Sequence, residues 1–264
     1  MKIRIRLWVK ITTLIIILFT MFFIYGRFIN TKGFKVQEYS INGNIPDSFT
    51  GFKIVHISDI NYKHTTSYND LKKIIKRINL INPDLVIFTG DLLNINIKYS
   101  EKDIKDLIKL LSSIKANIGK YAINGEEDLE FDEFEQILND SNFTLLNNYE
   151  LIYNKSSDKI LLTNADINEY NDLYKIFIIH KPDDIDNINY DKYNLILAGH
   201  SINGYINIPY IKNLFLTEGS KKYYNNYYKL NNTLFYISYG IGTKDYKFRI
   251  LNKPSFNLYR LKKD

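Results

Sequence analysis

Short polar blocks, each directly after a run of apolar residues, constrain the fold of this chain more than any other feature of its sequence. Short continuous apolar runs are typical of strands that are buried on both faces. The polar residues of the blocks are therefore expected at strand ends. The blocks are Ser58-Asp59-Ile60-Asn61, Thr89-Gly90-Asp91, Asn124-Gly125-Glu126-Glu127-Asp128, Ile178-Ile179-His180 and Ala198-Gly199-His200-Ser201-Ile202-Asn203-Gly204.

The first half of the chain alternates such strands with amphipathic helices. Apolar residues at helical spacing follow two of the apolar runs, and Pro83 ends the first of these helices. This alternation implies sheets that are covered on both faces by other layers. The predicted strands are residues 34–39, 52–57, 85–88 and 121–123, and the predicted helices are 71–80, 104–111 and 131–138.

The second half contains short strands with few strong helical patterns between them. The two halves together predict one α/β domain with a four-layer α/β/β/α sandwich and no internal repeat. The predicted strands of this half are residues 151–153, 160–162, 176–179, 195–198, 234–237 and 256–259.

A separate apolar segment precedes this domain. The uncharged run 11–26, extended by residues 7–9, approaches the ~20 residues that span a bilayer. No small-x-small cleavage site follows it, so residues 1–30 predict one transmembrane helix, an uncleaved signal anchor, and residues 31–264 form the domain. The run is preceded by basic residues, namely Lys2, Arg4, Arg6 and Lys10.

These basic residues favour a cytoplasmic N-terminus. We therefore expect a single-pass protein of the bacterial cell membrane whose domain is extracytoplasmic. Arg27, Lys32 and Lys35 on the other side weaken this bias, and the reversed orientation stays open.

Composition excludes some kinds of site. The chain has no cysteine, which rules out disulfides and thiolate metal sites. Its 22 tyrosines are scattered, and its net charge of +6 comes largely from the termini, so no nucleic acid is expected as a partner.

The order and context of the five blocks resemble the calcineurin-like metallophosphoesterase family, in its small membrane-associated bacterial branch. That family runs D-x-H, G-D, G-N-H-D/E, a lone H and then G-H-x-H, each at the end of a strand. The resemblance spans residues 34–262 and includes two later segments. Residues 203–209 resemble the family's G-G-Q-I-x-x-P, and residues 238–243 resemble its S-x-G-L-G-T.

The resemblance implies a site in which two divalent ions clamp a phosphoester. In the family, the first metal is held by the Asp and His of D-x-H and by the last His of G-H-x-H. Here Asp59 is retained, Asn61 replaces one histidine, and Ile202 replaces the other. The first site should therefore bind metal poorly, unless His64 substitutes for a lost ligand.

The second metal of the family corresponds to Asp91, Glu126, His180 and His200, with Glu126 at the position of an asparagine. Two imidazoles and two carboxylates suit one Mn, Fe or Zn ion, so one ion is expected rather than two, and none remains open. The alternatives are a helix N-cap for Asp91 and satisfied buried side chains for the histidines.

Glu127 occupies the position of the family's catalytic histidine. A carboxylic acid serves as a general acid only if burial or a like charge raises its pKa. The surrounding acidic residues would disfavour an anionic substrate. These residues are Asp59, Asp91, Glu126, Glu127 and Asp128.

Two functions stay open from the sequence. The first is a membrane-anchored metallophosphoesterase, weakened or altered by its substitutions, that acts on a phosphoester such as a lipid or a cell-envelope metabolite. The second is an inactive relative that acts as a binding or scaffold protein at the cell envelope. The fold alone does not choose between them.

Overall fold

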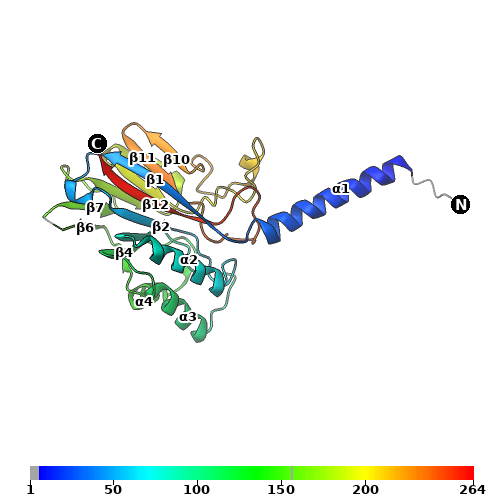
Figure 1. Ribbon diagram of the computed structural model, residues 1–264, viewed down its shortest axis with the longest axis horizontal. Helices are drawn as coiled ribbons and strands as arrows, with labels where there is room; N and C mark the ends of the chain where they lie inside the picture. The colour runs from blue at the N-terminus through cyan, green and yellow to red at the C-terminus, as the bar shows by residue number, and fades with distance from the viewer. Residues whose placement is uncertain (1–5, 156) are drawn as a thin grey trace.

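The computed structural model describes residues 6–155 and 157–264, so the predicted basic residues Lys2 and Arg4 lie outside the described residues. Two six-stranded sheets form the centre of the domain, and both mix parallel and antiparallel pairs (Figure 1). This arrangement confirms the predicted α/β class with two sheets.

The first sheet has the order β1-β12-β2-β3-β4-β5. Its strands are β1 (Lys35–Gly43), β12 (Ser255–Lys263), β2 (Lys53–Ile57), β3 (Leu85–Phe88), β4 (Gly119–Ala122) and β5 (Thr144–Leu145). Strands β2 to β5 are parallel, so their carboxyl ends share one edge. The C-terminal strand β12 lies between β1 and β2, parallel to β1 and antiparallel to β2.

The second sheet has the order β10-β11-β9-β8-β7-β6. Its strands are β10 (Tyr227–Leu230), β11 (Thr233–Ile237), β9 (Leu195–Ala198), β8 (Lys175–Ile179), β7 (Lys159–Thr163) and β6 (Tyr149–Tyr153). Strands β7, β8, β9 and β11 are parallel. The carboxyl ends of β8 and β9 therefore also share an edge.

Three helices cover the outer face of the first sheet: α2 (Tyr68–Ile81), α3 (Glu101–Ser112) and α4 (Phe134–Asp140). Their ends follow local chemistry. The Ser67 side chain accepts a hydrogen bond from the Asp70 backbone N–H, and Ser100 with Asp103 forms a capping box. Asn82 ends α2 in the left-handed conformation, directly before Pro83.

The period of two along β2 divides the core. Val55 and Ile57 pack with the helices, whereas Ile54 belongs to the cluster between the two sheets. That inter-sheet cluster includes Ile176 and Leu197 of the second sheet. The site-bearing strands are therefore held on both faces.

The predicted fourth layer of α-helix over the second sheet is corrected by the structure. In the described residues, the outer face of the second sheet is covered by 3-10 turns at Pro182–Asn187 and Tyr190–Lys192. Ile185 and Tyr193 from this segment pack against Phe177 of β8. The connection between β8 and β9, residues 180–194, folds into these two short turns and not into an α-helix.

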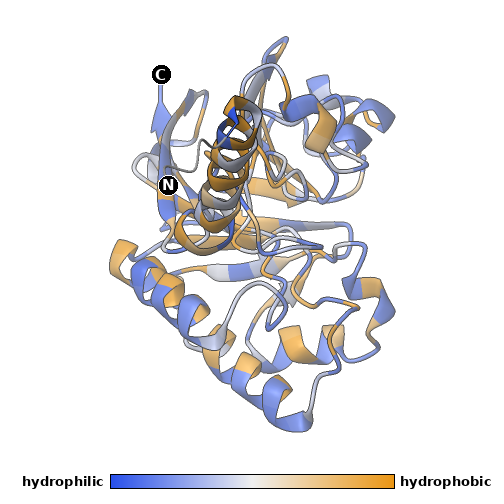
Figure 2. Cartoon of the chain, turned by 90° about the vertical axis from the view of Figure 1, so that its right-hand side faces the viewer, coloured by the Kyte–Doolittle hydropathy of each residue, from blue (hydrophilic) through white to orange (hydrophobic). Residues whose placement is uncertain are grey.

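Helix α1 (Leu7–Ile24) projects away from the domain and continues as a π-helical turn, Tyr25–Ile29. Figure 2 shows α1, which points toward the viewer, as mostly hydrophobic, whereas the helices over the first sheet carry hydrophobic and hydrophilic sides. The stretch Leu7–Ile29 is long and apolar enough to cross a membrane. A helix of this kind fits a membrane anchor or a signal sequence.

Candidate metal centre

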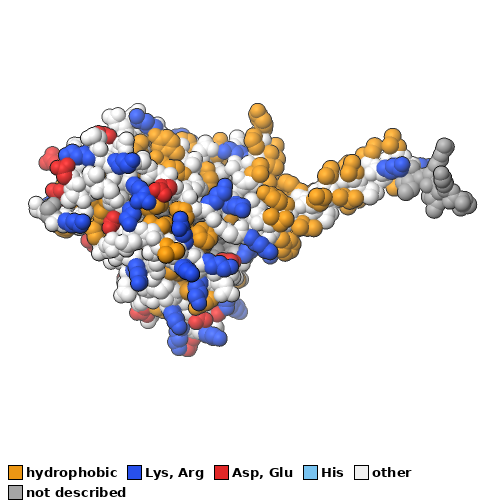
Figure 3. All heavy atoms as spheres, in the orientation of Figure 1, with side chains coloured by type: hydrophobic (Ala, Val, Ile, Leu, Met, Phe, Trp, Pro, Cys, Tyr) orange, Lys and Arg blue, Asp and Glu red, His pale blue; other side chains and the backbone are white. Residues whose placement is uncertain are grey.

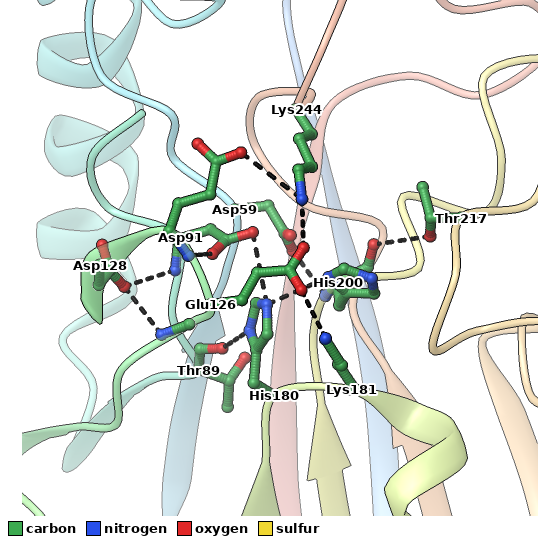
Figure 4. Close-up of polar contacts among 12 residues, drawn as sticks. Asp59, Thr89, Asp91, Glu126, Asp128, His180, Lys181, His200, Thr217 and Lys244 are labelled. Carbon is green, nitrogen blue, oxygen red and sulfur yellow. Dashed lines mark hydrogen bonds and ion pairs between the residues drawn. The ribbon is translucent and has the colours of Figure 1, made fainter. Parts of the chain in front are cut away.

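Four side chains from four strand ends meet between the two sheets (Figure 4). Asp59 follows β2, Asp91 follows β3, His180 follows β8 and His200 follows β9. One ligand atom of each lies within 4.8 Å of all the others. Each sheet contributes two of the four side chains, so the cluster depends on how the sheets pack.

The backbone at this cluster is held in an uncommon conformation. Asp59, Asp91 and His200 have φ values of 51°, 60° and 62°. Such left-handed residues cost about 1–3 kcal/mol each and persist where the surrounding structure over-determines them. Here the Asp59 N–H donates to the Gly90 carbonyl at 2.9 Å, and the His200 N–H donates to Asp59 Oδ2 at 3.0 Å.

Two glycines allow the loops to approach each other. Gly90 has φ of 96°, and a Cβ there would lie 2.4 Å from the Gly125 nitrogen. A Cβ on Gly125 would lie 2.1 Å from Asp91 Oδ1. Any larger residue at Gly125 would therefore displace the Asp91 carboxylate.

Backbone carbonyls set the proton positions of both histidines. His180 Nδ1 lies 2.6 Å from the Thr89 carbonyl oxygen, and His200 Nε2 lies 2.6 Å from the Glu218 carbonyl oxygen. A carbonyl oxygen only accepts, so each of these nitrogens carries a hydrogen. In the neutral rings, the free lone pairs are then on His180 Nε2 and His200 Nδ1, which face each other at 3.1 Å.

Two facing lone pairs require a positive charge between them. In the protein without an ion, His180 takes a proton, and its Nε2 lies 3.3 Å from Asp91 Oδ2. Burial lowers the pKa of His180, but the Asp91 and Asp59 carboxylates and the Thr89 carbonyl together outweigh it and raise this pKa to about 9. Burial and the neighbouring His180 charge lower the pKa of His200 to about 4.

The residues present fit a divalent metal ion. The donor set is two carboxylates and two imidazoles, and each imidazole donates its other N–H to a carbonyl, as metal-ligating histidines commonly do. Imidazole and carboxylate ligands suit Zn, Fe or Mn. The chemistry of the donors therefore supports one ion at this position.

The substituted positions of the site are used differently. Asn61 Oδ1 accepts a hydrogen bond from Asn94 Nδ2 at 2.7 Å, and its own Nδ2 has no partner in the described part of the chain. Ile202 is buried, and its carbonyl accepts from the Asn252 side chain. The Ile202 side chain offers no ligand atom, and the role of Asn61 as a metal ligand stays a prediction.

Glu126, predicted as a ligand, lies outside the cluster. Its carboxylate is held between Lys181, at 2.5 Å, and Lys244 (Figure 4). Burial opposes its ionisation, but the two lysines outweigh it and hold the pKa of Glu126 at about 2. In this arrangement its negative charge is neutralised by ammonium groups, and its role as a ligand stays a prediction.

Glu127 is buried and faces a groove of about 490 Å³ that Glu126 and Lys244 also line. Its Oε2 accepts from the Ile95 N–H at 3.2 Å, and its Oε1 lies 3.6 Å from Lys244 Nζ. Burial raises the pKa of Glu127, and the Asp91 charge adds to this effect. This environment is the one that a carboxylic general acid requires.

The comparisons with known proteins agree with this geometry. The family model described as calcineurin-like phosphoesterase matches residues 52–235, which is more than half of the chain. The chain belongs to this family. The predicted family is therefore confirmed.

Curated relatives place the chain among bacterial members of the family. It is 29% identical over 256 residues to the "Uncharacterized metallophosphoesterase YkuE" of Bacillus subtilis (strain 168), covering 90% of this chain and 89% of the relative. It is 34% identical over 92 residues to the UDP-2,3-diacylglucosamine pyrophosphatase LpxG of Chlamydia trachomatis, covering 33% of this chain and 27% of the relative.

Among solved structures, the Pseudomonas putida nuclease MPE is 12% identical, with a TM-score of 0.37. That alignment covers 60% of this chain and 65% of the nuclease. At this TM-score, the likeness carries no further argument.

Sequence reasoning did not foresee how this calcineurin-like site uses Asp128. The buried Asp128 carboxylate accepts four backbone N–H bonds, of 2.7–3.1 Å, from Asp91, Leu92, Leu93 and Gly125. It therefore positions the loop that carries Asp91. Its place as the third carboxylate of its block was the available signal.

The other histidines lie away from the cluster. His64, the candidate substitute ligand, is in a surface loop, where its Nε2 lies 2.9 Å from the Asp245 carbonyl. His56 is buried within β2 against Thr89 and Tyr259. Lys181 and Lys244, which hold Glu126, were missed because no local pattern marks a lysine that pairs across the fold.

Proposed function

We propose that this chain is a membrane-anchored phosphoester hydrolase that works with one divalent ion. The observation that carries the proposal is the four-residue cluster in which both histidines have their free lone pairs directed at one position. Asp91, His180 and His200 would hold the ion, with Asp59 beside them. When bound, the ion supplies Lewis-acid polarisation of a phosphoryl oxygen.

The protein's own groups supply the rest of the chemistry. Burial raises the pKa of Glu127, which favours the protonated form that would donate its proton to the leaving oxygen. Lys181 and Lys244 offer ammonium groups that bind phosphate oxygens as point charges. Glu126 now pairs with both lysines, so an anionic substrate must compete with its carboxylate.

We further propose that residues 1–30 anchor the domain, residues 31–264, in the bacterial cell membrane, with the domain on the extracytoplasmic side. A phosphoester of a lipid or of an envelope metabolite is then the substrate class within reach. Support comes from the apolar stretch Leu7–Ile29 and from the likeness to LpxG, whose name describes a pyrophosphatase of a diacylated sugar nucleotide.

The second candidate function is an inactive binding protein. It is favoured by Asn61 and Ile202, which contribute nothing to the cluster, and by the ion pairs that occupy Glu126. In this case the cation would only stabilise the loops.

Metal analysis and turnover together separate the two candidates. The full chain is purified in detergent without chelator, its metal is counted by elemental mass spectrometry, and hydrolysis of bis-p-nitrophenyl phosphate and p-nitrophenyl phosphate is measured with added Mn²⁺. We expect about one ion per chain and metal-dependent turnover that Asp91→Asn abolishes. The exposed Asp132 lies outside the site, so Asp132→Asn is the matched control.

A bound ion without turnover of either ester would reject the hydrolase in favour of the binding protein. Absence of both ion and turnover would reject the metal site itself. Turnover that persists in Asp91→Asn would show that the activity comes from elsewhere.

A further inference from the structure

The end of α1 is packed tightly against the domain. The rings of Phe22 and Phe23 lie 6.1 Å and 5.4 Å from the ring of Phe248. Gly26 lies so close to this ring that a Cβ would be 2.4 Å from it, and its carbonyl accepts from the Arg249 N–H at 3.0 Å. The helix therefore enters the domain at a defined place.

Large apolar side chains are exposed beside this place. Leu214 is 80% exposed and Tyr246 is 75% exposed, and Tyr210 and Ile211 are exposed in the same loop as Leu214. Figure 3 shows hydrophobic side chains continuing from α1 onto the adjoining end of the domain. We call Tyr210, Ile211, Leu214 and Tyr246 the juxtamembrane patch.

A groove joins this patch to the helix. It has a volume of about 720 Å³ and is lined by Phe23 of α1, by Ile206 and Phe215 of the loop, and by Tyr246 and Phe248. The loop is also bonded to residues 248–250, the segment that contacts α1. The Ile250 N–H donates to the Tyr205 carbonyl at 2.9 Å, and the Asn207 N–H donates to the Ile250 carbonyl at 2.9 Å. Helix, loop and groove thus form one continuous apolar surface.

Charged groups also line the groove, as they commonly do at a membrane interface. Arg27 and Lys247 lie there together with Asp245, and Lys247 Nζ lies 3.6 Å from Asp70 Oδ2. The Asp245 carboxylate accepts from the Tyr205 hydroxyl at 2.8 Å. Tyrosines with exposed rings and flanking cations are the side chains that occupy the headgroup level of membranes.

The length of α1 gives the depth of this surface. The apolar stretch has 23 residues, which is about 35 Å of helix against a hydrocarbon core of about 30 Å. Residues near its C-terminal end therefore lie at the boundary between acyl chains and headgroups. Phe22 and Phe23 lie about 10 Å of helix before Ile29. Because Phe248 contacts both rings, the domain surface around it lies on the acyl-chain side of this boundary.

We propose that the juxtamembrane patch is a second membrane contact of the domain, which lies at the boundary between headgroups and acyl chains of a lipid bilayer next to α1. The occupant is the bilayer because the patch is continuous with the membrane-spanning stretch, and the proposal rests on α1 being inserted. Interfacial apolar groups of this kind are buried by about 5–10 Å.

This contact bears on the metal centre through chain connectivity. The patch loop directly follows residues 200–204, and Tyr246 lies two residues after Lys244, which pairs with Glu126. A docked patch would therefore restrain two loops that lead into the site.

The absence of cysteine from the chain allows a direct test. The full chain carrying Leu214→Cys or Tyr246→Cys is labelled with an environment-sensitive fluorophore and reconstituted into vesicles of phosphatidylcholine and phosphatidylglycerol, with and without brominated acyl chains. The controls are Leu80→Cys, at a side chain 69% exposed, and Tyr153→Cys, at one 54% exposed. Tyr153 ends β6, on the side of the domain away from α1 (Figure 1).

We expect bromine to quench the labels at 214 and 246 and to leave those at 80 and 153 unchanged. The single tryptophan, Trp8, lies in α1, and its quenching reports insertion of the helix independently. Quenching of Trp8 without quenching at 214 or 246 would overturn the proposal. An unquenched Trp8 would also overturn it. So would labels at 214 and 246 that report an apolar environment but are not quenched by bromine, because a protein partner would then cover them. None of these readouts depends on hydrolysis, so failure here is distinct from failure of the proposed activity.

Discussion

The site has two halves, one with Asp91, His180 and His200 and one with the substituted residues Asn61 and Ile202. Their backbones are similar, but their side-chain chemistry differs. On one side, Asp91 and His200 have φ of 60° and 62°, and on the other, Asn61 and Ile202 have φ of 47° and 51°. For a β-branched residue such as isoleucine this conformation is a genuine outlier. The loops therefore keep their shape even where the side chain offers no ligand.

The difference teaches that loop shape and ligand identity are set separately. Backbone hydrogen bonds hold the Asn61 loop, because the Asn61 N–H donates to the Asp91 carbonyl at 3.0 Å. These bonds do not depend on the side chain at position 61. The half with both histidines has in addition the carbonyl partners that orient their rings. The fold alone is thus a weaker indication of metal binding than the orientation of the two imidazole rings is.

The largest expected effect is on metal content, when a predicted ligand is removed from the half that has both histidines. His200→Ala should reduce the metal content from about one ion per chain to none. The loss in affinity should exceed the roughly 10–100-fold that is typical when a group that hydrogen-bonds to a metal ligand is removed. Elemental mass spectrometry measures this content. His64→Ala removes a surface imidazole and should change nothing. Full metal content in His200→Ala would show that the retained half is not the metal site.

The second prediction concerns pH. An ion must displace the proton of His180, whose pKa is raised to about 9 in the metal-free protein. Mn²⁺ affinity should therefore rise about tenfold per pH unit from pH 7 toward 9 and then level off. The sign for the metal-free protein is opposite, because stability from the charged His180 is complete below the ordinary pKa of about 6.5 and is lost as pH rises through 9.

Titration calorimetry in two buffers of different ionisation enthalpy checks this linkage by counting the protons released. An affinity that does not change between pH 7 and 9 would mean that His180 holds no proton for the ion to displace.

A smaller effect is expected where Glu126 competes with anions. In the metal-loaded protein, Glu126→Gln should tighten binding of inorganic phosphate, and Lys244→Gln should weaken it. Each change should be up to about fivefold, in line with ~1 kcal/mol for a partly exposed ion pair. Glu130 lines the same groove, so Glu130→Gln is the control. Changes of the same sign in Glu126 and Lys244 variants would contradict a phosphate subsite there.

The smallest effect on metal is expected in the substituted half. Asn61→Ala should leave metal affinity unchanged, because the Asn61 oxygen already accepts from Asn94. Thermal unfolding should instead show a loss of about 1 kcal/mol in the free energy of unfolding, since Asn94 loses a buried hydrogen bond. A clear drop in metal affinity would show that Asn61 reaches the ion after all.

The sequence by itself determined the four strands that lead into the site and the positions of the residues that follow them. Short continuous apolar runs predicted the strands β2, β3, β8 and β9. The polar block after each run contains Asp59, Asp91, His180 or His200. The helical spacing marked α2 and α3 in the same way, and the structure adds a serine cap at the start of each. These signals are local, since they depend on neighbours within a few residues.

Only the tertiary structure decided which groups meet. The C-terminal strand β12 enters the first sheet beside β1, and Glu126 pairs with Lys181 and Lys244 instead of joining the four ligands. Glu126 and Lys244 are 118 residues apart, and no short pattern in either segment marks the other. Such pairings depend on how the two sheets pack against each other, because packing determines which loops come within reach of a side chain.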